Sequence, residues 1–167
     1  MNTLIAVAGK TGTTMRCAAL LSVQLGGAQI VNLELETPDP ADYDLIVVGS
    51  AVRMGQLHRK VRDFLARYEQ ALLAKPFACF VCCGFGEQAQ EYLKDGFGSA
   101  LLAHACAAGS FGGEMRTEEL TGMDKFLVGM VAKSLKEQNK PLPTVDMQAI
   151  ARFAETLKAG CGSGADA

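Results

Sequence analysis

The 167-residue sequence contains no tryptophan, only two histidines and no long apolar stretch. No run approaches the roughly 18 apolar residues of a transmembrane helix, and the start, MNTLIAVAGK, lacks the basic leader of a signal peptide. Sixteen basic and eighteen acidic residues give a net charge of −2, without the basic block typical of nucleic-acid binding. We therefore expect a cytoplasmic protein with no nucleic-acid partner.

The six cysteines are expected to stay reduced in that compartment. Cys79 and Cys82 form a CxxC motif inside the apolar run FACFVCCG, which is typical of a buried strand. Side chains three apart on a strand face opposite sides of the sheet, and no second CxxC accompanies this one. We interpret the two residues as buried thiols rather than as a zinc site or a redox pair, and we expect no metal.

Five short apolar runs predict strands covered on both faces, at residues 3–8, 28–33, 45–49, 77–83 and 105–111. Helical patterns occupy residues 14–25, 58–73, 87–103, 120–135 and 147–158. This alternation with right-handed crossovers predicts an α/β three-layer sandwich around a five-stranded parallel sheet of order 2-1-3-4-5. Residues 1–160 are predicted to form a single domain and residues 161–167 a frayed tail.

Ligands of such sheets bind beyond the carboxyl ends of the strands, so the loops after strands 1, 3 and 4 form the predicted site. The first loop contains Gly9-Lys10-Thr11, the end of a Walker loop, but the glycine that a Walker loop needs is replaced by Leu4. We therefore reject ATP. The glycines and hydroxyls of residues 9–14, followed by a helix N-terminus, favour another phosphate, and the alternative is a tight turn with a threonine cap.

The spacing AGKTGTT resembles the FMN phosphate loop of flavodoxins, with Gly12 and Thr14 in its closing positions. Ala8 stands where those proteins usually have a hydroxyl residue, and Lys10 stands where Thr or Ser is common. We expect one phosphate ligand to be missing here and a cation to replace it.

A second resemblance is to the menaquinone-dependent protoporphyrinogen dehydrogenase branch of the flavodoxin superfamily. Residues 42–68, DYDLIVVGSAVRMGQLHRKVRDFLARY, carry its order of Tyr-Asp, apolar strand, glycine, small residues, arginine and histidine. Residues 109–133, GSFGGEMRTEELTGMDKFLVGMVAK, are also similar to that branch, whereas the middle segment CCGFGEQAQEYL matches it poorly. The likeness covers nearly the whole chain, which is identified as a flavodoxin-like protein.

The resemblance implies FMN, with its phosphate on residues 9–14 and its ring between the loops after strands 3 and 4. Met54 occupies the position where the branch tends to carry tyrosine, and Arg53 is implied to tune the flavin or grip a substrate carboxylate unless it is a solvated loop residue. No side chain is needed as a nucleophile. The implied cofactor contacts are Gly9, Lys10, Thr11, Gly12, Thr13, Thr14, Ser50, Ala51, Val52, Arg53, Met54, Gly55, Cys83, Gly84, Phe85 and Gly86.

By this resemblance the chain is an FMN oxidoreductase that takes a hydride from a reduced, porphyrinogen-like small molecule and passes electrons to a quinone or a redox protein. A pure electron carrier and a flavin-free binding or scaffold domain are the alternatives, although a carrier is usually more acidic. A phospho-receiver is excluded because Gly9-Lys10 and Gly49-Ser50 replace its acidic residues. The apolar stripe within residues 120–135 is expected to pack in the core, or else to contact a quinone, a peripheral membrane surface or a second subunit of a homodimer.

Overall fold

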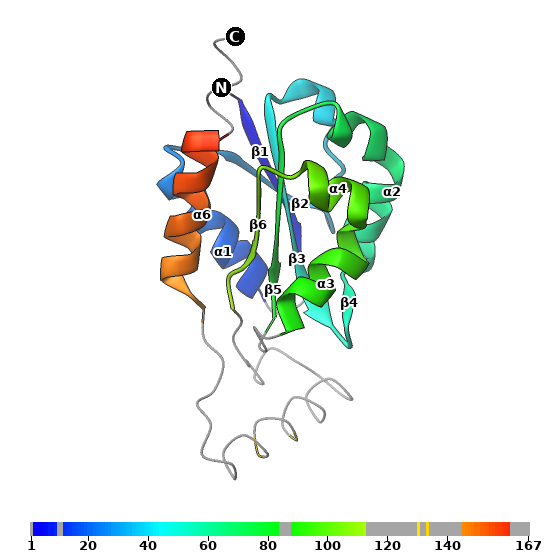
Figure 1. Cartoon of the computed structure of the whole chain (residues 1–167), viewed down its shortest axis with the longest axis vertical. Coiled ribbons are helices and arrows are strands. Elements are labelled where there is room, and N and C mark those ends of the chain that lie inside the picture. The colour runs from blue at the N-terminus through cyan, green and yellow to red at the C-terminus, as the bar shows by residue number, and fades with distance from the viewer. Residues whose placement is uncertain are drawn as a thin grey trace.

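The apolar runs of the sequence form five parallel strands, in the order β2-β1-β3-β5-β6 (Figure 1). The computed structural model describes residues 2–9, 12–83, 88–112 and 145–160, together with Met130 and Lys133. The strands are β1 (Thr3–Ala8), β2 (Gln29–Asn32), β3 (Leu45–Arg53), β5 (Phe77–Cys82) and β6 (Ala107–Ser110). A short sixth strand, β4 (Gln56–Leu57), pairs antiparallel with the end of β3. Since β4 lies off the main path, the predicted order 2-1-3-4-5 is confirmed.

Helices cover both faces of the sheet (Figure 1). α1 (Thr13–Gln24) and α6 (Met147–Gly160) pack on one face, and α2 (Arg59–Leu73), α3 (Ala89–Phe97) and α4 (Ser99–His104) pack on the other. A short 3₁₀ turn, η1 (Pro40–Asp42), lies in the connection between β2 and β3. Every residue of β5 is buried, and Cys79 and Phe80 belong to different core clusters. Successive side chains thus enter opposite layers, which is why these strands are continuously apolar.

Two elements differ from the sequence prediction. β3 continues to Arg53 instead of ending near residue 49, and the chain turns back through Met54 and Gly55 into β4. Both turn residues have positive φ values, 52° and 77°, as the central residues of a type I′ hairpin turn do. The helix predicted over residues 87–103 is divided into α3 and α4 at Gly98, whose φ of 85° interrupts helical geometry.

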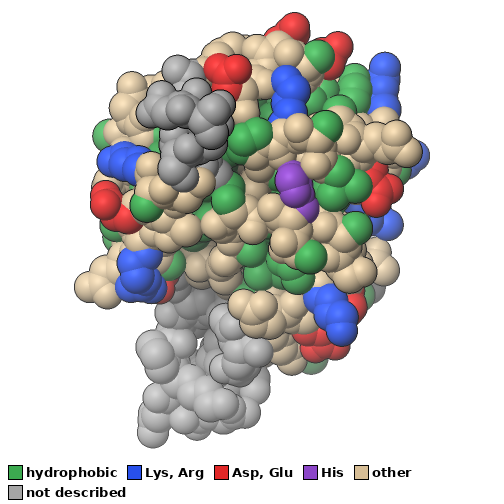
Figure 2. All heavy atoms as spheres, turned by 45° about the horizontal axis from the view of Figure 1, so that its top comes forward, with side chains coloured by type: hydrophobic (Ala, Val, Ile, Leu, Met, Phe, Trp, Pro, Cys, Tyr) green, Lys and Arg blue, Asp and Glu red, His purple; other side chains and the backbone are tan. Residues whose placement is uncertain are grey.

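The remaining predictions concern parts of the chain that the structure does not describe. The helix predicted over residues 120–135, apart from Met130 and Lys133, and the tail 161–167 lie outside the described residues. Within the described ranges, each helix is too short or too polar to cross a bilayer. Figure 2 shows basic and acidic side chains interspersed over one face, without a block of a single sign.

Candidate functional site

The predicted phosphate loop joins β1 to α1 at the carboxyl edge of the sheet. Gly12, with a φ of 83°, directly precedes the first residue of α1. The first backbone hydrogen bond of the helix runs from Arg16 N to Gly12 O at 3.0 Å, and no described side chain caps the helix start. Backbone N–H groups of the first turn therefore point out of the helix toward the loop. Lys10 and Thr11, also predicted to bind the phosphate, lie outside the described residues.

Thr14 gives this loop a buried hydroxyl. The residue is 1% exposed, and Oγ1 has no hydrogen-bond partner among the described residues. Cys82 lies close enough for its thiol to interact with the Thr14 hydroxyl, although the geometry of the pair does not make a hydrogen bond. Its hydrogen bond with Cys17, followed by burial, raises the pKa of its thiol well above the usual range, although the Thr14 hydroxyl opposes that rise.

A buried hydroxyl without a partner costs about 1–3 kcal/mol, so a hydrogen-bonding ligand is the natural complement of Thr14. A Cβ atom added to Gly9 would lie 2.5 Å from Thr14 Oγ1 and 3.3 Å from Ala51 Cβ. Only glycine keeps this space open. A helix start that no described side chain caps, a buried hydroxyl and a closely approached glycine together fit a phosphate group.

The loops after β1 and β3 are neighbours, because Ala8 pairs with Ser50 in the sheet. The ladder pair Ala51 and Cys82 brings the end of β5 beside them. The strand ends that carry Gly9, Gly12, Thr13 and Thr14, Ser50 to Gly55, and Cys83 are therefore neighbours in the sheet. Gly84, Phe85 and Gly86 lie outside the described residues. Cofactor contact by any of these residues stays a prediction.

The hairpin between β3 and β4 carries the predicted contacts Arg53, Met54 and Gly55 at its tip. Val52 pairs with Leu57, and Arg53 pairs with Gln56. Met54 follows in the left-handed region and is 79% exposed. A methionine in this backbone conformation is uncommon, and its thioether stands out from the protein rather than packing in the core.

Ser50 and Cys83 have partners within the chain. Ser50 is fully buried, its hydroxyl donates to Ala51 O at 2.8 Å, and it accepts from His58 N at 2.8 Å. Cys83 is 5% exposed, with Sγ 3.6 Å from Ser110 Oγ. Their side chains therefore shape the site from within the fold, and only their backbone groups are left to face a ligand.

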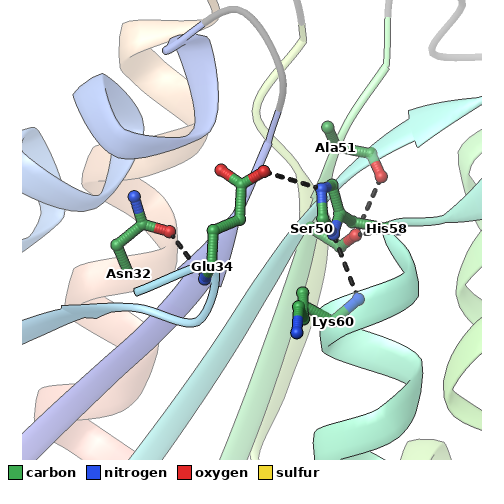
Figure 3. Close-up of polar contacts among 6 residues, drawn as sticks. All are labelled: Asn32, Glu34, Ser50, Ala51, His58 and Lys60. Atoms are coloured by element: carbon green, nitrogen blue, oxygen red, sulfur yellow. Dashed lines mark hydrogen bonds and ion pairs between the residues drawn. The ribbon is translucent and has the colours of Figure 1, made fainter. Parts of the chain in front are cut away.

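His58 and Glu34 form a contact that the sequence analysis did not single out. His58 Nε2 lies 3.2 Å from Glu34 Oε1, and the two residues join the hairpin to the connection after β2 (Figure 3). The histidine belongs to the segment that carried the second resemblance. Glu34 is separated from it by 24 residues, and no local pattern in the sequence pointed to this pairing.

The cysteines are mainly packing residues. Cys79 and Cys82 lie in opposite core clusters, so the two positions of the CxxC motif face different helical layers as predicted. Burial raises the pKa of Cys79 to about 12. Cys106, however, is disulfide-bonded, and the expectation that all six cysteines are reduced is wrong at this residue. The described residues contain no cluster of three or more potential metal ligands.

Comparison with known proteins agrees with this architecture. Protoporphyrinogen IX dehydrogenase (quinone) of Escherichia coli strain K12 is 21% identical over 173 residues, covering 94% of each chain. NAD(P)H dehydrogenase (quinone) of Rhizobium rhizogenes is 30% identical over 129 residues, which cover 69% of this chain but only 65% of that relative.

Solved structures share the fold at low sequence identity. Flavodoxin 1 from Bacillus cereus has a TM-score of 0.55 and 15% identity, covering 95% of this chain and 98% of its own. A flavoprotein from Lactobacillus acidophilus NCFM, solved in complex with FMN, has a TM-score of 0.52 and 15% identity, covering 65% and 92%. The family model of the flavodoxin domain matches residues 4–141. This chain therefore belongs to the flavodoxin domain family.

Proposed function

We propose that this chain is an FMN-binding oxidoreductase with its cofactor at the carboxyl ends of β1, β3 and β5. The observation that carries the proposal is the buried hydroxyl of Thr14, which has no hydrogen-bond partner among the described residues, at a start of α1 that no described side chain caps. Family membership and the FMN named for a structural relative support the choice of this phosphate ester over others.

Bound FMN would supply two-electron redox chemistry between a reduced substrate and an acceptor. The residues of the chain would bind and orient it. The first turn of α1 and Thr14 would hold the phosphate, while the β3–β4 hairpin would present Arg53 and Met54 to the ring. A fixed guanidinium beside the ring would favour its anionic reduced form or hold a substrate carboxylate.

We propose a quinone as the acceptor, because both curated relatives are named as quinone enzymes. A porphyrinogen-like donor is the finer proposal, supported by the relative that covers 94% of this chain. A carrier without its own substrate remains the second candidate. Anaerobic reduction of the FMN-loaded protein by each donor separates the two, since a carrier will be reduced only by redox proteins.

Titration of flavin fluorescence with the protein tests FMN binding directly. The unmodified chain is expected to quench FMN with a saturable curve, and Gly9→Ala is expected to weaken binding at least about tenfold by displacing Thr14. Gly160→Ala is the matched control, because its added Cβ meets nothing within 4 Å. Absence of quenching by the unmodified chain would favour a flavin-free scaffold instead.

The finer predictions on location and assembly also remain proposals. Four buried thiols support a cytoplasmic location, whereas the disulfide at Cys106 opposes it. Alkylation of thiols at the moment of cell lysis decides between them, because a cytoplasmic protein should yield six modified cysteines. Membrane contact or dimerisation through residues 120–135 stays a prediction on a segment outside the described residues.

A further inference from the structure

Three segments of the chain meet at His58, which lies between β4 and α2 (Figure 3). Its backbone N–H donates to Ser50 Oγ at 2.8 Å. Its ring Nδ1 accepts from Lys60 N at 3.1 Å and so caps the start of α2. Its Nε2 reaches Glu34 Oε1 at 3.2 Å. One residue thus connects the end of β3, the start of α2 and the connection after β2.

These contacts define the tautomer of the neutral ring. Because Nδ1 accepts a hydrogen bond from a backbone N–H, the proton of the neutral imidazole resides on Nε2, where it donates to the Glu34 carboxylate. Glu34 is held in turn by its own backbone N–H, which donates to Asn32 Oδ1 at 3.0 Å. Asparagine at position 58 could still cap α2, but its shorter side chain could not also reach Glu34.

The connection after β2 is not fully packed against α2. A cavity of about 200 Å³ lies between them, lined by Leu33, Thr37, Lys60, Asp63, Phe64 and Arg67. Beyond the cavity, Lys75 Nζ donates to the carbonyl oxygens of Pro40, Ala41 and Tyr43 at 2.9, 3.1 and 2.6 Å. The connection after β2 is thus held by His58 at the start of α2 and by Lys75 just after its end, with the cavity between these two contacts.

The same histidine closes the hairpin of the candidate site. Ser50 Oγ accepts a hydrogen bond from the His58 N–H and donates one to Ala51 O at 2.8 Å, so the hydroxyl connects the outgoing and returning chains. The hairpin lies between Ser50 and His58 and contains Arg53 and Met54 at its tip. Any shift of His58 would therefore move the segment that faces the proposed flavin.

We propose that His58, oriented by Glu34, is a positioning residue that fixes the β3–β4 hairpin for cofactor binding. The inference rests on the proposed function and adds to it a role for two residues outside the predicted contact set. His58 itself touches neither cofactor nor substrate in this proposal. It acts through Ser50 and through the start of α2.

The test compares His58→Asn with His104→Asn in the full-length chain. His104 is the only other histidine, and its ring contacts the backbone carbonyl of Lys75 at 2.7 Å, near the far end of α2. We expect His58→Asn to raise the FMN dissociation constant about tenfold and to shift the midpoint potential of the bound flavin, with neither change in His104→Asn. Glu34→Gln retains an acceptor for Nε2–H and is expected to change binding less than about twofold, whereas Glu34→Ala should resemble His58→Asn.

A second readout needs no flavin. Amide hydrogen exchange of residues 51–57 in the flavin-free protein should become faster in His58→Asn and Glu34→Ala and stay unchanged in His104→Asn. Unchanged exchange overturns the inference, as does an unchanged FMN dissociation constant in a protein that binds FMN. If the unmodified chain binds no FMN while exchange still responds to His58, the proposed function fails and the role in cofactor binding fails with it, leaving His58 as a purely structural anchor.

Discussion

At the scale of single residues, Thr14 has opposite effects in the empty and loaded protein. Its hydroxyl is buried and has no hydrogen-bond partner in the part of the chain that the structure describes, so replacing it with the isosteric apolar side chain in Thr14→Val removes a desolvation cost. We expect the free energy of unfolding of the flavin-free variant to be about 1 kcal/mol higher than that of the unmodified chain, as measured by urea denaturation. The same change should weaken FMN binding about tenfold, because the phosphate loses a hydroxyl donor.

Thr156→Val is the control for that change. Thr156 lies on α6, and its hydroxyl donates to Arg152 O within its own helix at 2.9 Å. Its removal should leave FMN binding unaltered. If Thr14→Val lowered the stability of the empty protein, the hydroxyl would have a partner after all, and the phosphate assignment would lose its main support.

Cys79 makes stability depend on alkaline pH. Its pKa is about 12 in the folded protein against 9.0 for an ordinary thiol, because burial disfavours the thiolate. Below pH 9 the thiol is protonated in the folded and in the unfolded protein, so its ionisation does not reduce the free energy of unfolding. Above it the unfolded state releases the proton first, and the free energy of unfolding falls by about 1.4 kcal/mol per pH unit until the folded pKa is reached.

Comparing Cys79→Ala with the unmodified chain isolates this contribution. The variant should be less stable at neutral pH because it leaves a small cavity. Its stability should nevertheless decline less steeply with pH. At about pH 10.5 the variant should have lost about 2 kcal/mol less of its free energy of unfolding than the unmodified chain, in parallel urea titrations. Parallel curves for the two proteins would mean that Cys79 ionises without cost in the folded state. The pKa of Tyr43 is also raised, mainly by burial, but this residue is present in both proteins and changes their stability equally.

At the scale of elements, the central strand β3 tolerates no side chain at Gly49. A Cβ there would overlap the end of the Phe80 ring on the neighbouring β5. Phe80 cannot swing away, because it stacks on Phe111 at 4.4 Å between ring centroids and meets Phe153 edge-on at 6.1 Å. We expect Gly49→Ala to reduce the free energy of unfolding by about 3 kcal/mol in urea denaturation.

Gly109→Ala on β6 provides the comparison for that strand. Its added Cβ would lie 3.9 Å from Phe153 Cδ2, an ordinary contact, and the change should stay within about 0.5 kcal/mol of the unmodified chain. Equal losses at the two positions would show that glycine itself, rather than the Phe80 ring, matters in these strands.

The strands were predictable because burial on both faces leaves a continuous apolar signal in each of them. The hairpin was not, since Ser50 and Arg53 interrupt that signal and Met54 is an unusual residue for a left-handed turn. The glycine-rich turn between β1 and α1 could be located from glycine and threonine spacing, which is local, while phosphate binding by this turn stays a prediction. The contact between His58 and Glu34 could not, because the fold alone brings these residues together.

At the scale of the whole molecule, alternation of strands and helices predicts two helical layers, but not which segments complete each layer. The family match ends at residue 141, whereas α6 (Met147–Gly160) begins after it and still supplies core residues. Phe153 from this helix packs against Phe80 and Phe111, beneath the same sheet face as α1. The layer opposite α2 therefore depends on the C-terminal helix.

This dependence predicts unequal effects of two substitutions on α6. Phe153→Ala removes a ring that is 5% exposed, and we expect a loss of about 4 kcal/mol in the free energy of unfolding. Met147→Ala, at a position that is 55% exposed on the same helix, should cost less than about 0.5 kcal/mol. Because a domain of this size has only about 5–15 kcal/mol of stability, the first loss should appear in urea denaturation as a much lower midpoint. Similar midpoints for the two variants would show that α6 contributes little to the core, and that the fold is complete within the region shared with the family.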